Sequence, residues 1–102
     1  MNSFNIIISS KAQSDLAECI SFVLNVSKEA ARKLANDIYS AIESLKIFPE
    51  RNAVLNMPKT FHFITRKLIV NKRYIVVYTT EDNNVVIYRI FDARRNFDSL
   101  IK

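Results

Sequence analysis

The chain has 102 residues, of which 49% are hydrophobic and 25% charged, and its formal net charge is +5. This length predicts one domain, residues 1–102, with a core large enough to fold without a disulfide or metal. The sequence has no glycine and one cysteine, which excludes glycine-rich phosphate loops and a cysteine cage for a metal. No apolar run approaches the ~20 residues of a membrane span, and no signal peptide is recognisable, so we expect a cytoplasmic protein without metal or cofactor.

Positive charge is concentrated in the last part of the chain. Residues 1–58 hold six basic and six acidic residues, whereas residues 59–102 hold nine basic against four acidic residues. The second segment therefore carries the whole net charge. Such an imbalance predicts one cationic surface, suited to nucleic acid or to an acidic protein.

A strand and a helix are predicted at the N-terminal end. Residues 4–8 are rich in aromatic and β-branched side chains, which is typical of a strand. Ser10, with Gln13 three residues later, forms a predicted capping box. Apolar residues then recur at helical spacing over residues 11–24, and Cys19 belongs to this apolar face as a small buried side chain.

A second helix is predicted after a short break. Ser27 can cap it, and the helical pattern continues to about residue 47, where Pro49 ends it. Two helices joined by so short a loop favour an antiparallel hairpin.

Three strands are predicted after a loop at residues 50–60: residues 62–70, 73–80 and 85–91. The order β-α-α-β-β-β predicts an α+β, two-layer domain in which the helical hairpin covers one face of an antiparallel sheet. The other face would be left at least partly to solvent or to a partner.

Side chains on the predicted strands alternate between the two faces of the sheet. Tyr74 and Tyr78 would share one face of the middle strand. The last strand is expected to present three residues on a common face, namely Ile87, Arg89 and Phe91. Basic residues lie in or beside these strands: Arg66, Lys67, Lys72, Arg73, Arg89, Arg94 and Arg95. We predict a cationic cluster, interleaved with tyrosines, that holds phosphates or carboxylates, and the alternative is a solvated basic rim without a ligand.

Candidate groups for other chemistry are few. His62 is the only histidine and has no obvious local partner, so a surface or packing role is expected. No acidic cluster has the spacing of a metal site, and a nucleophile elbow requires glycine. Any RNA cleavage would therefore depend on arginines, lysines and tyrosines that stabilise a charged transition state.

The chain resembles the RelE/ParE superfamily of bacterial toxins along nearly its whole length. The resemblance is carried, in chain order, by Ala12, Asp15-Leu16, Leu45-Lys46-Ile47-Phe48-Pro49, Arg66-Lys67-Leu68, Tyr74-Ile75-Val76-Val77-Tyr78, Val86-Ile87-Tyr88-Arg89-Ile90 and Arg94-Arg95. It implies the same strand order, and the toxin component of a type II toxin–antitoxin system. A cognate antitoxin would wrap this toxin in a hetero-oligomer.

The resemblance leaves two activities open. RelE-like members cut mRNA in the ribosomal A site, whereas ParE-like members poison DNA gyrase. RelE-like nucleases commonly carry an arginine at the position of Ile75, and some relatives carry a histidine at the position of Asp92. Both departures favour the ParE-like reading. Lys67, with Arg94 or Arg95, falls where RelE-like enzymes keep basic residues, so these are the candidate catalytic residues of the alternative, a metal-independent endoribonuclease.

Binding of the target is predicted to involve four residues: Arg66, Arg73, Tyr78 and Arg89. Whether the chain is an enzyme stays open, because a gyrase poison needs no catalytic group. A third hypothesis, a harmless nucleic-acid-binding module, depends on charge alone.

Overall fold

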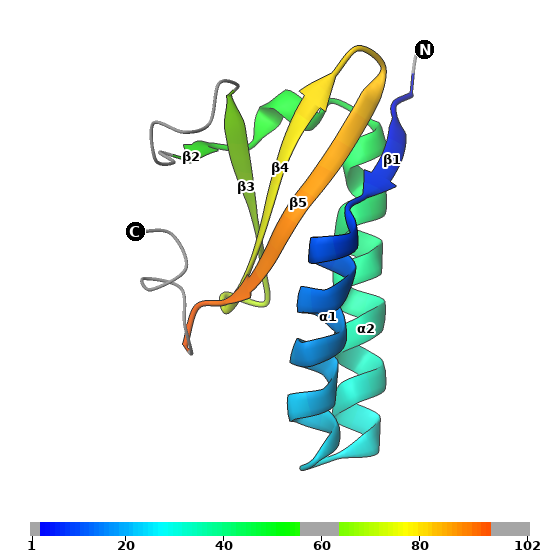
Figure 1. Cartoon of the computed structure of the whole chain (residues 1–102), viewed down its shortest axis with the longest axis vertical. Helices are drawn as coiled ribbons and strands as arrows, with labels where there is room; N and C mark the ends of the chain where they lie inside the picture. The colour runs from blue at the N-terminus through cyan, green and yellow to red at the C-terminus, as the bar shows by residue number, and fades with distance from the viewer. Residues whose placement is uncertain (1–2, 56–63, 95–102) are drawn as a thin grey trace.

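The computed structural model describes residues 3–55 and 64–94, so His62 and Arg95 lie outside the described residues. Two helices pack against a sheet of five strands (Figure 1). The elements are β1 (Asn5–Ile8), α1 (Ser10–Leu24), α2 (Lys28–Glu43), the 3₁₀ turns η1 (Ser44–Lys46) and η2 (Pro49–Arg51), β2 (Val54–Leu55), β3 (Thr65–Val70), β4 (Tyr74–Glu81) and β5 (Asn84–Asp92). The predicted α+β, two-layer class is confirmed. The short β2 lies in a segment predicted as loop.

The sheet has the strand order β1-β5-β4-β3-β2. Strands β3, β4 and β5 form the antiparallel meander that the short polar turns predicted. The sheet as a whole is mixed, because β1 pairs in parallel with β5. The helical hairpin returns the chain to the end where β1 starts, and three further reversals leave β5 running in the direction of β1 (Figure 1).

The first helix begins one residue earlier than predicted. Ser9 is its N-cap, and its hydroxyl accepts a hydrogen bond from the backbone N–H of Ala12 at 3.0 Å. Gln13 donates its side-chain amide to the carbonyl of Ile8. The capping box at Ser10 is therefore wrong, because Ser10 already lies inside the helix.

The second helix is capped by Ser27, as predicted, but it ends at Glu43 and continues as η1. Arg51 closes this end: one guanidinium nitrogen donates to the carbonyls of Ser44, Ile47 and Phe48 at 3.2, 2.6 and 3.2 Å. The carbonyls of Ser44 and Phe48 also accept backbone N–H groups, so the donations from Arg51 add to these bonds and give the carbonyl of Ile47 a partner.

The main core lies between the helices and the sheet. Many of its members are fully or almost fully buried, among them Leu16, Ile38, Ile42, Leu45, Val76, Tyr78, Ile87 and Ile90. Cys19 is buried in the same core, as predicted. None of the helices in the described part of the chain is long and apolar enough to cross a membrane.

A second, smaller cluster lies on the sheet face away from the helices. Ile75, Val77 and Phe91 are 9%, 0% and 2% exposed, and Leu55 of β2 packs against them. The centre of this outer face is therefore buried. The solvent exposure predicted for this face is found beside the cluster, at Ile69, which is 54% exposed.

Candidate target-binding surface

A β-bulge at Tyr88 determines which residues of β5 face outward. Val77 pairs with Arg89, but the next residue of β4, Tyr78, pairs with Ile87, so Tyr88 has no counterpart on β4. Such an extra residue shifts the alternation of side chains. Ile87 therefore packs in the main core, whereas Phe91 belongs to the outer cluster. The expectation that Ile87, Arg89 and Phe91 share one face is wrong.

Two cations flank the outer cluster. Lys67 of β3 and Arg89 of β5 both pair with Val77 of β4, so the three residues form a row across the outer face. Two strand spacings separate the outer members of this row, which is about 10 Å. Lys67 is half-buried, and Arg94, two residues beyond β5, is exposed. We call Lys67, Arg89 and Arg94 the outer cations.

Arg89 is held by a carboxylate on α1. Its Nε and a terminal nitrogen donate to the two oxygens of Asp15 at 2.7 and 3.1 Å. The guanidinium also lies 4.9 Å from the ring centre of Phe91. The side chains of Arg89 and Asp15 are 23% and 12% exposed. Arg89 thus has little freedom to reach toward a target.

Arg73 is paired in the same manner at the other end of the sheet. It donates to both oxygens of Asp92 at 3.0 and 2.8 Å and lies over the ring of Tyr74. The hydrogen-bonded carboxylate raises the pKa of Arg73 above its usual value. Two of the predicted target contacts, Arg73 and Arg89, are therefore committed to internal ion pairs.

Tyr78 is 0% exposed and belongs to the main core. Its hydroxyl donates to the carbonyl of Pro49 at 2.6 Å and accepts from the amide of Asn52 at 2.9 Å. Burial raises the pKa of this phenol, although the hydrogen bond from Asn52 and the charge of Arg66 act in the opposite direction. The expectation that Tyr78 contacts a target does not fit this burial.

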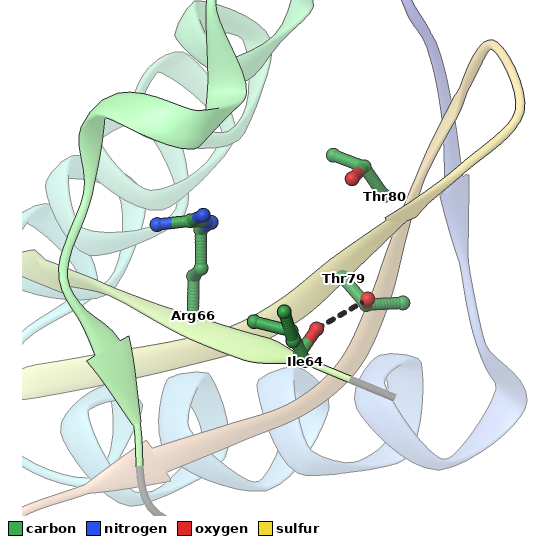
Figure 2. Close-up of a pocket in the computed structure, with 4 residues that line it drawn as sticks. All are labelled: Ile64, Arg66, Thr79 and Thr80. Atoms are coloured by element: carbon green, nitrogen blue, oxygen red, sulfur yellow. Dashed lines mark hydrogen bonds between the residues drawn. The ribbon is translucent and has the colours of Figure 1, made fainter. Parts of the chain in front are cut away.

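Arg66 lies on the other face of the sheet from Lys67. It pairs with Tyr78 in the register, and its guanidinium donates to the carbonyl of Asn52 at 2.8 Å. Figure 2 shows the Arg66 side chain standing beside a pocket also lined by Ile64, Thr79 and Thr80. The predicted cluster is therefore divided: Lys67 and Arg89 lie on one face and Arg66 on the opposite one.

Several partners of these cations were not predicted. Asp15 and Asp92 are ordinary surface residues by local pattern, and nothing in the sequence links them to Arg89 and Arg73. Thr80 carries no charge, so only the strand register places it beside Arg66. Within residues 3–55 and 64–94, no three His, Cys, Asp or Glu side chains lie close enough to hold a metal ion. The surface thus offers fixed positive charge beside apolar side chains.

Known structures share this fold. The chromosomal ParDE toxin–antitoxin system from P. aeruginosa contains a chain that matches with a TM-score of 0.70 and 20% identity, over 88% of this chain and 96% of that chain. The RelBE2 toxin–antitoxin complex from Mycobacterium tuberculosis contains one with a TM-score of 0.60 and 19% identity, over 90% and 93%. A conserved hypothetical protein from Helicobacter pylori matches with a TM-score of 0.56 and 14% identity, over 89% and 96%. These likenesses define the fold as that of RelE/ParE-like proteins.

The sequence model of one family covers residues 6–97, and that family is described as the ParE toxin of the type II toxin–antitoxin system parDE. The chain therefore belongs to the ParE toxin family. No curated protein sequence matches it significantly.

Proposed function

We propose that this ParE-family toxin acts in the cytoplasm by inhibiting DNA gyrase, and that a cognate antitoxin keeps it inactive in a hetero-oligomer. Membership of the family supports the toxin role. The choice of gyrase over RNA depends on one observation: which side chains stand at positions 75 and 92, where related nucleases carry catalytic groups.

Both positions are occupied by side chains committed to the fold. Ile75 lies in the outer cluster, between Ile69 and Phe91 in the register, and is 9% exposed. It offers no cation for a scissile phosphate. The side chain of Asp92 is 4% exposed and forms an ion pair with Arg73. Its carboxylate therefore has a structural role and does not replace the histidine that donates a proton in some relatives. These two residues favour a toxin that works by binding.

An antitoxin partner is supported by the neighbouring structures, two of which are described as a toxin–antitoxin system and a toxin–antitoxin complex. The helices of this chain also offer a suitable surface. A pocket of about 330 Å³ is lined mainly by apolar side chains, and Tyr39 is 52% exposed. Its wall residues are Ile8, Gln13, Leu16, Ala17, Ile20 and Tyr39. Apolar side chains of an amphipathic segment fit such a surface, and the net charge of +5 favours an acidic partner.

The proposal is tested with purified toxin, purified gyrase and relaxed plasmid. Added toxin should block supercoiling and trap gyrase on cleaved DNA, and premixing with the antitoxin should restore supercoiling. Normal supercoiling at a large molar excess of folded toxin would contradict the proposal.

The alternative is a ribosome-dependent endoribonuclease, and one observation favours it. Lys67 is half-buried on the outer face and Arg94 is exposed just beyond β5, at positions where RelE-like enzymes keep basic residues. Primer extension on ribosome-bound mRNA decides between gyrase inhibition and mRNA cleavage. Cuts within codons would show that the target is mRNA and not gyrase.

A further inference from the structure

A pocket of about 240 Å³ lies beside the start of β3 and the end of β4. Its walls are Ile64, Arg66, Thr79 and Thr80 (Figure 2). A water molecule occupies about 30 Å³ in the liquid, so the pocket holds a small functional group together with neighbouring atoms. It is separate from the outer cations, because Arg66 points to the opposite face from Lys67.

The Arg66 side chain is fixed by a chain of hydrogen bonds that ends in the core. Arg66 donates to the carbonyl of Asn52 at 2.8 Å, the amide of Asn52 donates to the hydroxyl of Tyr78 at 2.9 Å, and Tyr78 donates to the carbonyl of Pro49 at 2.6 Å. Tyr78 is fully buried, so this chain is anchored in the core of the fold. The guanidinium is therefore held in place before any ligand arrives, which reduces the entropy lost on binding.

Donors remain for a ligand. Within residues 3–55 and 64–94, no other group accepts a hydrogen bond from Arg66, and its Nε and second terminal nitrogen have the geometry for a planar, bidentate acceptor. The hydroxyl of Thr79 is already used, because it donates to the carbonyl of Ile64 at 2.6 Å, as the dashed line in Figure 2 shows. Thr80, in contrast, has no hydrogen-bond partner among the described residues. Its side chain and that of Arg66 stand on the same side of the sheet (Figure 2).

The chemistry of the walls indicates which anion is bound. Nucleic acid presents a row of phosphates and is held by several cations, whereas Arg66 is the one charged residue among the described residues that line this pocket. Glu81 and Asp82 follow directly at the same end of β4 and repel a polyanion. Ile64, 64% exposed, instead offers apolar contact beside the guanidinium. We propose that this pocket binds the carboxylate of an Asp or Glu in a partner protein segment, with an apolar neighbour of that residue packed on Ile64.

The test is an NMR titration of the folded toxin with three probes. The first is the peptide acetyl-Ala-Leu-Glu-Leu-Ala-amide, the second is the same peptide with Gln in place of Glu, and the third is a short oligothymidylate. The Glu peptide should shift the signals of Ile64, Thr80 and the Arg66 side chain in a saturable manner. It should bind about tenfold more tightly than the Gln peptide, as expected when a hydrogen-bonded charge is lost.

Variants link this binding to the pocket. Arg66→Gln should abolish the preference for Glu over Gln, and Arg66→Lys should keep part of it, because the charge remains while the planar fork is lost. Thr80→Val, which keeps the shape of the side chain, should weaken binding of the Glu peptide several-fold. It also serves as the second variant if Arg66→Gln disturbs the fold. Arg32→Gln on the exposed face of α2 removes an equal charge and should change nothing.

Three outcomes would overturn the proposal: no saturable shift at the pocket, equal affinity for the Glu and Gln peptides, or tighter binding of oligothymidylate at the same residues. The last would assign the pocket to a nucleic-acid phosphate. None of these results depends on whether gyrase is the target, so failure here is distinguishable from failure of the proposed function.

Discussion

Asp15 of α1 and Arg89 of β5 lie 74 positions apart in the chain and form a bidentate ion pair at 2.7 and 3.1 Å. The same carboxylate accepts the backbone N–H of Ile90 at 3.0 Å, and Ser9 donates its hydroxyl to the carbonyl of Tyr88. β1 pairs with β5 only as far as Ile87, so the remaining edge of β5 would be open. The first helix thus closes a strand edge that would otherwise be available for pairing with another chain.

Asp15→Asn should lower the free energy of unfolding by about 2 kcal/mol. This value lies between those of exposed and fully buried ion pairs, because both side chains keep some exposure. The expected fall in Tm is about 10 °C for a chain of this size. Thermal and urea unfolding measure both quantities.

The matched control is Glu43→Gln, which removes a carboxylate from the exposed ion pair with Lys46. It should change stability by no more than about 0.5 kcal/mol. If the two variants lose equal stability, the pair between Asp15 and Arg89 does not hold the edge of β5 as described.

Tyr78→Phe should lower the free energy of unfolding by about 1–2 kcal/mol at neutral pH, because Pro49 and Asn52 lose a buried partner. The exposed Tyr39→Phe should cost less than about 0.5 kcal/mol. A loss for Tyr78→Phe as small as that of the control would mean that the hydroxyl contributes nothing.

Tyr78 also predicts a dependence of stability on pH. Its pKa is raised in the folded protein by burial, so folding favours the neutral phenol. Its contribution is fully present below the ordinary tyrosine value of about 10, and is lost as the pH rises through the higher folded value. Wild-type stability should therefore fall more steeply above pH ~10 than that of Tyr78→Phe. Parallel pH profiles from urea unfolding would contradict this assignment.

Phe48 has a left-handed backbone, with φ at 53°, although it is not glycine and its side chain is 66% exposed. This conformation costs a residue with a Cβ about 1–2 kcal/mol. Phe48→Gly should therefore raise stability by about 0.5 kcal/mol, since glycine relieves the strain but loses more entropy on folding. At neighbouring Ile47, φ is −115°, so Ile47→Gly should lower stability. A fall of equal size in both variants would show that Phe48 is not strained.

Lys67 and Arg94 are the outer cations without an ion pair among the described residues. Replacing both with alanine should raise the toxin concentration needed to inhibit gyrase by about tenfold. Stability should change by no more than about 0.5 kcal/mol. Lys28→Ala with Arg32→Ala, which removes the same charge at the start of α2, should leave inhibition near the wild-type value. Equal losses from both pairs would indicate that net charge alone matters.

Much of the fold follows from local pattern. Helical spacing of apolar residues located both helices, and asparagine-containing turns separated the three strands of the meander. The alternation of β4 was also predictable, because that strand is regular. The alternation of β5 was not, since the bulge at Tyr88 arises from pairing with β4 and leaves no local signature. The parallel pairing of β1 depends equally on the path of the whole chain.

The candidate site was predictable only as a collection of charges. The two-residue period of a strand correctly places Arg66 and Lys67 on opposite faces of the sheet, but it cannot tell which cations form internal ion pairs. Arg73 and Arg89 meet carboxylates that lie 19 and 74 positions away, and Tyr78 points into the core. The first pair follows from the register of β4 and β5, and the second from the position of α1 against the sheet. Residue spacing encodes neither of these.

The most direct test of gyrase inhibition follows two quantities in one culture after the toxin is induced without its antitoxin: plasmid supercoiling, with gyrase-linked DNA breaks, and the integrity of ribosome-bound mRNA. We expect supercoiling to fail and breaks to accumulate while the message stays intact. Cleavage of the message within codons, in cells that keep normal supercoiling, would contradict the account.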